Sequence, residues 1–431
     1  MSSISPTALA ARRRARLRVL LDLARRMNGW SRHELAERLG RDATKLIPAS
    51  GNPKLDLVVA VAGALGWDPG DVVDDLWTPR ELSTIPDSTE PRSSSTDELL
   101  ARGLAALDRR RWDEARAVAV ALRESCGSAD SEDDAVADEL EAAAWSGAGC
   151  HATAVAVVRR GMSAGELAFA SHIRLSLRLA MCNYELWNLV EARAIASDLL
   201  DQMRRRSVDD RLVRRTVASA HAIRGHASRR LIGADSADRS RHVRQACEDL
   251  ALAEQEFLAL FEEFGEIADL GASHLHRGGV LEARATGDGS GPEAVATIID
   301  GLENAVDLDR LAPEEAIEAH GWWCVFGCNL ALRSMSGEDR ERSLAILTNK
   351  AFEIADRLEH WSIRERAFTF EHFRRQRIGT RVEEVDVSRS PESRWVLDEE
   401  DLGHVLGTMG RFPSFRAVGW RILEESGLVE D

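Results

Sequence analysis

The chain has few of the features that mark membrane, secreted or disulfide-stabilised proteins. No apolar run approaches the ~20 residues that a membrane-spanning helix needs. Residues 8–27 are rich in arginine and lack the continuous apolar core of a signal peptide. Six cysteines are spread over 431 residues without the spacing of a disulfide framework, which suits a reducing compartment. We therefore expect a cytoplasmic protein that does not associate with a membrane.

Tyrosine and proline are also scarce. A single Tyr against eleven Trp argues against a β-rich surface, where Tyr is favoured. Only Pro292 and Pro313 fall between residues 97 and 375, so little in this stretch prevents long helices. Apolar residues there recur at three- and four-residue steps, and alanine is abundant. The sequence therefore predicts an all-α fold.

Recognisable catalytic and metal-binding patterns are missing. His274 and His276 stand two positions apart, which on a helix turns them roughly 200° away from each other. Cys324 and Cys328 share a helix face, but zinc needs two more ligands, so we interpret both as core thiols. The glycine-rich residues 287–292 lack the preceding strand and the following Lys-Ser/Thr of a phosphate-binding loop. We expect neither an enzyme nor a cofactor.

Charge is distributed unevenly along the chain. Residues 1–67 hold 12 Lys/Arg against 5 Asp/Glu, whereas the whole chain has a net charge of −16. Residues 1–79 sum to +3, so residues 80–431 carry −19. A basic segment attracts nucleic-acid phosphates through counterion release, while an acidic one is repelled. This contrast indicates a nucleic-acid-binding N-terminal domain joined to a larger acidic region.

Composition places three boundaries. Residues 78–96 contain 12 Ser, Thr or Pro among 19, so this segment cannot bury enough apolar surface to fold and forms a linker. Residues 1–77 precede it, residues 97–376 form the helical region, and residues 377–431 form a mostly helical C-terminal extension. Alternation over residues 380–389 favours a strand. A last helical segment over residues 398–425 is interrupted at residues 411–413, and its first acids suit a helix N-terminus.

The N-terminal domain shows five short helical segments. Ser31 and Glu34 have the spacing of a capping box, which starts the second helix, and Gly40 ends it. Asp42 is placed to cap a short third helix, which Pro48 closes. The five predicted segments are residues 8–27, 32–39, 43–47, 55–65 and 71–77.

This arrangement resembles the Xre/Cro/C1-type helix-turn-helix family. The matching residues are Glu34-Leu35-Ala36, Leu39-Gly40, Asn52-Pro53 and Ala62 with Leu65-Gly66. In that family the third helix lies in the major groove and the second crosses the phosphate backbone. The chain departs from the pattern in three ways: it has a shorter segment before Asn52, Arg41 at a usually buried aliphatic position, and no Gln at the start of the second helix.

The resemblance implies a set of DNA-binding residues. Ser31, Arg32 and His33 would meet phosphates at the start of the second helix. Arg41, Thr44 and Lys45 would lie nearest to base edges. A small helical module that docks on protein is the alternative interpretation.

Weak repetition runs through residues 97–376. Gly103 stands 12 positions before Ala115, and Ala180 stands 12 before Ala192. Small residues at this spacing let two antiparallel helices approach closely, which resembles the tetratricopeptide repeat. Another all-helical arrangement would show a similar alanine frequency.

The tetratricopeptide resemblance also implies candidate ligand contacts. It places Asn183 and Asn329 on first helices, where an Asn amide can hold a peptide backbone. Ordinary polar placement on a helix face is the alternative for both residues.

Together these features predict an all-α transcriptional regulator. A five-helix helix-turn-helix domain would bind double-stranded DNA, and a tetratricopeptide-like solenoid would dimerise and hold a peptide or protein ligand. A homodimer is expected because one short recognition helix buries too little surface, and two half-sites multiply the effect. The alternative is a protein-interaction scaffold whose N-terminal domain docks on protein.

Overall fold

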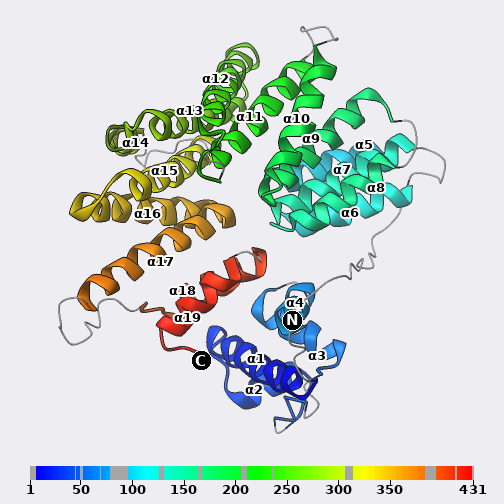
Figure 1. Ribbon diagram of the computed structural model, residues 1–431. Coiled ribbons are helices and arrows are strands. Elements are labelled where there is room, and N and C mark those ends of the chain that lie inside the picture. The colour runs from blue at the N-terminus through cyan, green and yellow to red at the C-terminus, as the bar shows by residue number, and fades with distance from the viewer. Residues whose placement is uncertain are drawn as a thin grey trace. The chain divides into compact units, whose positions relative to one another are not determined.

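The protein is all-α in the part that the structure describes. A computed structural model shows nineteen helices and no strand among these residues (Figure 1), which confirms the predicted fold class. The described residues are 6–43, 45–48, 52–67, 69–77, 96–125, 131–163, 167–204, 211–234, 237–305, 314–383, 395–412 and 415–429.

The chain divides into two compact units, and the boundaries differ from those expected. The first unit, here called the head, comprises Met1–Pro86 together with His372–Asp431. The second unit, here called the body, comprises Asp87–Glu371. Residues 377–431, expected as a separate extension, thus belong with the N-terminal helices. Of the expected linker, only Thr96 is described, and it begins a helix of the body.

The head contains four N-terminal helices and two C-terminal ones. They are α1 (Pro6–Met27), α2 (Arg32–Arg38), α3 (Leu55–Leu65), α4 (Pro69–Trp77), α18 (Glu399–Arg411) and α19 (Arg416–Glu425). Gly66 adopts a left-handed backbone (φ +66°) that ends α3, as its position in the sequence predicts. Asp398 and Asp401 form a capping box at the start of α18, which accounts for the acidic residues there.

The predicted third helix at residues 43–47 is wrong for the residues described there. Ala43 lies in a turn and residues 45–47 form a bend instead. Pro48 disfavours helical backbone at Ile47, and so short a segment cannot offset the entropy of nucleating a helix. The expected strand is also wrong at residues 380–383, where α17 (Trp361–Glu383) continues; the rest of it lies outside the described residues.

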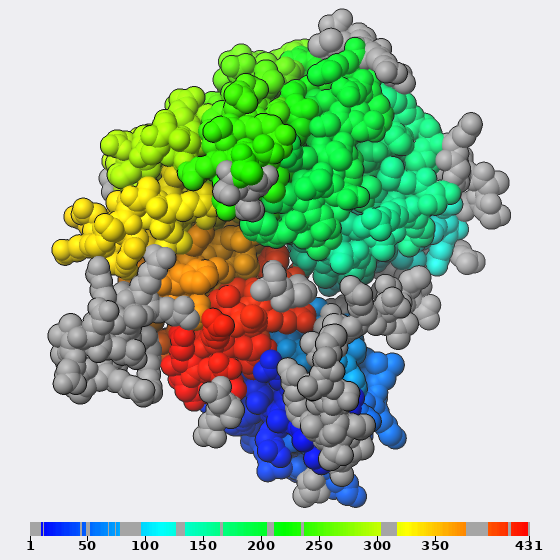
Figure 2. All heavy atoms as spheres, viewed as in Figure 1, coloured from blue at the N-terminus to red at the C-terminus, as the bar shows by residue number. Residues whose placement is uncertain are grey.

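The apolar core of the head is shared between the two ends of the chain. Helix α18 packs against α1, and the space-filling view shows the C-terminal helices lying directly on the N-terminal ones (Figure 2). Helix α1 contributes Leu17 and Leu20, each at most 1% exposed, and α18 contributes Val405 and Leu406, both fully buried. Neither segment buries its apolar stripe alone.

Polar contacts join the same helices. The indole Nε1 of Trp67 donates a 2.6 Å hydrogen bond to the carbonyl oxygen of Leu406. Trp420 Nε1 donates to Asp75 Oδ1 at 3.2 Å, and the Arg16 guanidinium lies 3.6 Å from the centre of the Trp420 ring. Arg416 forms an ion pair with Asp71. Asp71 and Asp75 of α4 therefore each contact a side chain more than 300 residues away in sequence.

The body is built from helices that pack mainly on their neighbours in sequence, as helical hairpins do. The first six are α5 (Thr96–Asp108), α6 (Trp112–Ser125), α7 (Ser131–Gly147), α8 (His151–Met162), α9 (Phe169–Glu185) and α10 (Leu189–Met203). They are followed by α11 (Arg211–Ala234), α12 (Arg239–Phe264), α13 (Ile267–Asp288), α14 (Gly291–Ala305), α15 (Glu314–Ser334), α16 (Gly337–Leu358) and the part of α17 up to Glu371; the rest of α17 is assigned to the head.

Small residues lie where the paired helices approach. A Cβ atom at Gly103 would overlap Leu140 and lie 3.2 Å from Val118, so only glycine fits there without a shift. Ala180 of α9 and Ala192 of α10 are fully buried in one apolar cluster. Both pairs that the 12-residue spacing singled out therefore belong to packed hairpins.

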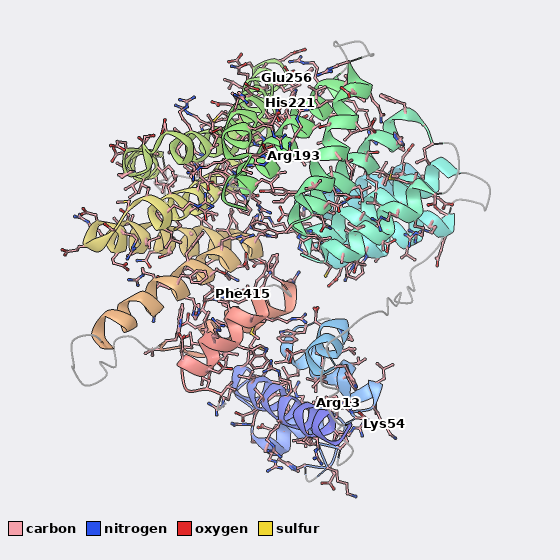
Figure 3. All side chains as sticks on the ribbon, in the orientation of Figure 1. Arg13, Lys54, Arg193, His221, Glu256 and Phe415 are labelled. Atoms are coloured by element: carbon pink, nitrogen blue, oxygen red, sulfur yellow. The ribbon has the colours of Figure 1, made fainter. Side chains whose placement is uncertain are left out.

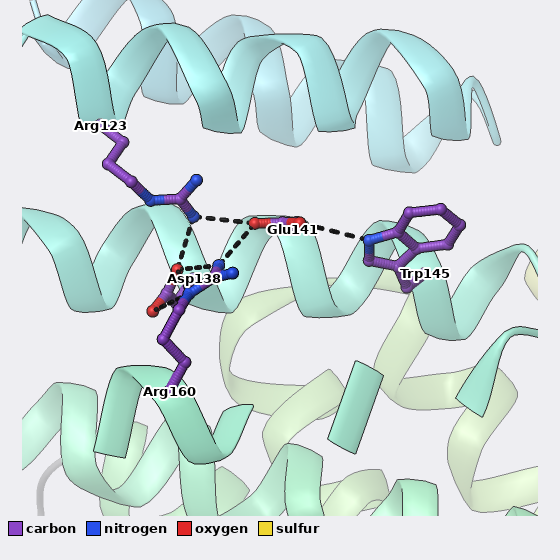
Figure 4. A network of polar contacts seen from close by, with 5 residues as sticks. All are labelled: Arg123, Asp138, Glu141, Trp145 and Arg160. Atoms are coloured by element: carbon purple, nitrogen blue, oxygen red, sulfur yellow. Dashed lines mark hydrogen bonds and ion pairs between the residues drawn. The ribbon is translucent and has the colours of Figure 1, made fainter. Parts of the chain in front are cut away.

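Ion pairs link successive helices of the body. Glu141 of α7 accepts hydrogen bonds from Arg123 of α6 (2.8 Å) and Arg160 of α8 (2.7 Å), and both arginines also pair with buried Asp138 (Figure 4). Because two guanidinium groups share two carboxylates, three helices are fixed in one arrangement.

The first hairpin of the body also contacts the last helices. Arg110, in the turn after α5, donates 2.8 Å and 3.1 Å hydrogen bonds to the Leu358 carbonyl and to Glu318. His360 Nε2 lies 3.0 Å from the other oxygen of Glu318. Although burial opposes ionisation, these hydrogen bonds and charges lower the pKa of Glu318 to about 2. Arg110 thus joins the first hairpin of the body to α15 and α16. No described helix is long and apolar enough to cross a bilayer.

Candidate nucleic-acid interface

The start of α2 forms as its sequence predicts. Glu34 donates its backbone N–H to Ser31 Oγ at 3.2 Å, and Glu34 Oε2 accepts the Ser31 backbone N–H at 2.8 Å. This capping box, led by the backbone hydrogen bond, lowers the pKa of Glu34. Ser31 thus serves first to begin the helix, and its hydroxyl stays at the exposed end of α2.

The structure brings one expected phosphate ligand, Arg32, to the loop after α2. Arg32 and His33 are exposed, and the Arg32 guanidinium donates a 3.4 Å hydrogen bond to the Ala43 carbonyl. Lys45 is exposed two residues further along. Arg32 and Lys45 therefore lie on adjoining parts of one surface. Thr44, the third expected base contact, lies outside the described residues.

The Arg41 side chain, expected near base edges, contacts the first turn of α3. Its guanidinium forms a 2.6 Å ion pair with Asp56 in the first turn of α3, and its side chain is 27% exposed. Exposed ion pairs of this kind stabilise a protein by about 0–1 kcal/mol. A DNA phosphate can compete with so weak a pair, but the observed side chain does not project from a recognition helix.

Several other arginines of the head are engaged within the head. Asp22 pairs with Arg25 (2.9 Å) and Arg26 (2.7 Å) on α1, and their hydrogen bonds outweigh burial to lower the pKa of Asp22. The Arg13 and Arg38 guanidinium groups lie 5.7 Å and 5.2 Å from the rings of Trp77 and Trp30. The basic excess of the N-terminal sequence is thus largely used to hold the head together.

The charge of the assembled head is balanced. Residues 1–86 contain 13 Lys/Arg and 10 Asp/Glu, whereas residues 372–431 contain 9 and 12. The unit therefore has 22 of each, and no overall positive charge attracts DNA to it. Any attraction depends on a local surface.

Sequence reasoning missed a further exposed cation of the head. Lys54 is exposed immediately before α3, at the outer edge of the head in Figure 3, and two residues from Asp56. The sequence Pro-Lys-Leu at the start of the apolar helix indicates that Lys54 is exposed, because a residue just outside a helix end is normally solvated. We define the basic surface as Arg32, His33, Lys45 and Lys54.

Part of α3 next to Lys54 is exposed and apolar. Leu55 is 71% exposed and Val59 is 49% exposed, one helical turn apart on the same face. A Cβ atom at Gly63, one turn further, would meet nothing within 4 Å. The head therefore offers an apolar stripe beside its basic surface.

The two asparagines singled out as peptide ligands differ in their surroundings. Asn183 is buried; its amide donates to the Leu179 carbonyl at 2.9 Å and accepts from Asn188 at 3.2 Å. Its hydrogen-bonding groups thus serve the α9–α10 turn. Asn329 is half-buried on α15. Cys324 and Cys328 of the same helix are buried core thiols, as predicted.

A buried polar cluster lies between α11 and α13 of the body. Glu282 forms an ion pair with Arg229, and these side chains are 1% and 7% exposed. Arg229 Nε donates to His226 Nδ1 at 3.2 Å, and His226 Nε2 lies 3.1 Å from His276 Nδ1. Because His226 Nδ1 accepts, its Nε2 carries the hydrogen that it donates to His276. Both rings are therefore neutral links in one chain of hydrogen bonds.

Acid should destabilise the body through this cluster. Burial lowers the pKa of His276 to about 3, below the unfolded value of 6.5, so the unfolded chain binds a proton that the folded chain refuses. Stability contributed above pH 6.5 is lost as pH falls toward 3, by about 1.4 kcal/mol per pH unit. Urea unfolding of the full chain at pH 7 and pH 5 should show this loss. In His276→Gln the loss should shrink by about 2 kcal/mol; an equal loss in both proteins would refute the assignment.

Comparison with known proteins adds no relative. The chain matches no protein-family description, no curated protein and no solved structure. Among the described residues, no group of three or more His, Cys, Asp or Glu side chains is arranged to hold a metal ion. The basic surface and the apolar stripe of the head are therefore the main indications of function.

Proposed function

We propose that this protein is a DNA-associating regulator whose head contacts the phosphate backbone and whose body binds a ligand or partner. The observation that carries the proposal is the basic surface of Arg32, His33, Lys45 and Lys54. None of the four forms an ion pair with a carboxylate within the described part of the chain. Exposed cations without a carboxylate partner are the groups that neutralise DNA phosphates and release the counterions condensed on the DNA.

The proposed contact is to the backbone more than to base edges. Major-groove reading needs a helix or ribbon that carries side chains to the bases, and residues 43 and 45–47 form no helix. Exposed Arg32, Lys45 and Lys54 favour binding that depends strongly on salt and weakly on sequence. Two copies of the chain on one duplex would multiply the affinity, so a homodimer remains part of the proposal.

Reversing the basic surface tests the proposal. The triple variant Arg32→Glu, Lys45→Glu and Lys54→Glu should bind random-sequence duplex DNA at least tenfold more weakly, as measured by fluorescence anisotropy of labelled DNA. The loss of three phosphate contacts should also reduce the salt slope of binding by about 3. All three side chains lie on the surface, so the fold should be retained.

A matched control keeps the total charge change the same. Arg109→Glu, Arg159→Glu and Arg204→Glu reverse three exposed cations of the body. If the control lost as much affinity as the head variant, net charge alone would explain binding, and the proposed surface would be wrong.

A second candidate function is a protein-interaction scaffold. The exposed Leu55 and Val59, together with the balanced charge of the head, favour it. An apolar docking surface keeps its affinity as ionic strength rises, whereas phosphate binding weakens steeply. Leu55→Asn with Val59→Asn should abolish binding to a protein partner and leave the salt slope for DNA unchanged, because neither change alters the charge beside Lys54.

A further inference from the structure

Arg193, in the first turns of α10, is an arginine without a counterion. Figure 3 labels it together with His221 of the neighbouring helix α11. The side chain is half-buried, and its Nε–H is buried without any hydrogen-bond partner. Within the described residues it makes no ion pair. Buried guanidinium donors are normally satisfied, so this group requires an explanation.

Asp249 of α12, whose charge acts on Arg193, is fully engaged with other groups. Arg224 donates two hydrogen bonds to it, at 2.8 Å and 2.7 Å. His221 Nδ1 lies 2.8 Å from one oxygen, and Gln245 donates to the other at 2.9 Å. Four hydrogen bonds fill the acceptor sites of one carboxylate, so none remains for Arg193.

The other carboxylates nearby are also taken. Asp238 pairs with Arg241 at the start of α12. Asp198 accepts from Gln202 at 2.8 Å, and Asp201 pairs with Arg204 at 3.0 Å. Among the described residues, no carboxylate of these three helices forms an ion pair with Arg193.

Two further cations disfavour the charged form of Arg193. Burial, then the charges of Arg241 and Arg224, lower its pKa, and the opposing Asp249 and Asp238 do not compensate. By contrast, Arg214 and Arg229 of the neighbouring helix each hold a glutamate directly. Arg224 also reaches α10, where its Nη1 lies 3.5 Å from Ser197 Oγ, one helical turn beyond Arg193. Asp249 and Asp238 are thus already paired, and Arg193 is not.

We propose that Arg193, with Arg241 and Arg224 beside it, binds an oxyanion: the phosphate group or the carboxylate of a small ligand. Guanidinium groups bind both through charge-assisted hydrogen bonds in the plane of the fork. The oxyanion would pair with the partly exposed guanidinium group of Arg193 and offset the excess positive charge. Arg241 is 58% exposed, so the site opens to solvent at the edge of α12. The inference concerns the body alone and is independent of DNA binding by the head.

Thermal unfolding of the full chain in the presence of simple anions tests the site. Inorganic phosphate, acetate and chloride are compared at equal ionic strength, since an anion that binds only the folded state raises the unfolding temperature. A rise above the chloride reference with phosphate, with acetate or with both identifies the oxyanion that the site accepts. An equal response to all three anions would overturn the proposal.

Variants separate this site from general ion effects. Arg193→Leu should lose the excess response, and it should unfold no earlier than the unmodified chain in chloride because it removes an unpaired buried charge. Arg193→Lys should keep part of the response, since the charge remains without the fork. Arg159→Leu, an exposed arginine of α8, should keep all of it. A full response in Arg193→Leu, or its loss in Arg159→Leu, would show that the anion binds elsewhere.

Discussion

Deleting residues 395–431 is expected to unfold α1 to α4 while the body stays folded. The deletion removes α18 and α19, whose buried Val405, Leu406 and Met409 complete the core under α1. Each fully buried side chain of this size contributes about 1.5–3 kcal/mol, and a whole domain has a net stability of only 5–15 kcal/mol. Losing several of them at once exceeds what a four-helix remnant of this size can supply.

Hydrogen exchange measures this result directly. Amides of α1 around Leu20 should exchange slowly in the full chain and rapidly in the truncated chain, while amides of the body keep their protection. Trp67→Phe is the matched control: it removes the hydrogen bond to the Leu406 carbonyl and keeps most of the apolar contact, so α1 should remain protected. Continued protection of α1 in the truncated chain would contradict the shared core.

The same contacts decide how the head has to be studied. A fragment of residues 1–78 would expose the apolar face of α1 and leave Asp71 and Asp75 without Arg416 and Trp420. Its failure to bind DNA would therefore report unfolding as readily as absence of function. Binding experiments need the full chain.

Replacing Glu282 with alanine should strongly destabilise the body, by about 3–5 kcal/mol. The change leaves the Arg229 guanidinium buried without its carboxylate, while His226 at its Nε is neutral and cannot replace that charge. Arg333, whose Nη1 lies 3.7 Å from Glu282, also loses a partner. Urea unfolding followed by circular dichroism gives the free energy of unfolding.

Two further variants separate the buried charge from the loss of volume. Glu262→Ala removes an exposed glutamate from α12 and should change stability by less than about 0.5 kcal/mol. Arg229→Met combined with Glu282→Met should recover much of the stability lost in Glu282→Ala, because no unpaired charge remains. If the double variant were as unstable as the single one, packing and not charge would explain the loss.

Local signals in the sequence were sufficient to place most of the head helices. Ser31 with Glu34, and Gly66 after a strongly apolar run, act within a few residues, so their pattern determines where α2 begins and α3 ends. The prediction of a third helix is wrong for a local reason as well. A segment of five residues before Pro48 has too few hydrogen bonds to be stable, whatever family it resembles.

The partners of the head helices could not be predicted in the same way. Nothing local to Trp67 indicates that its indole meets the carbonyl of Leu406, because the two are 339 positions apart. Arg41 illustrates the same limit at closer range: its pairing with Asp56 depends on how the loop folds back onto α3. Similarly, the isolation of Arg193 appears only when Asp249 is seen to be filled by residues of α11 and α12.

The salt dependence of DNA binding by the full chain tests the central proposal most directly. Association with a random-sequence duplex is measured from about 50 mM to 200 mM salt, the range over which phosphate contacts weaken steeply. With Arg32, Lys45 and Lys54 at phosphates, the logarithm of the association constant should fall against the logarithm of salt with a slope of about −3. Absence of binding at the lowest salt, or binding that salt does not weaken, would contradict the account and favour the protein-docking alternative.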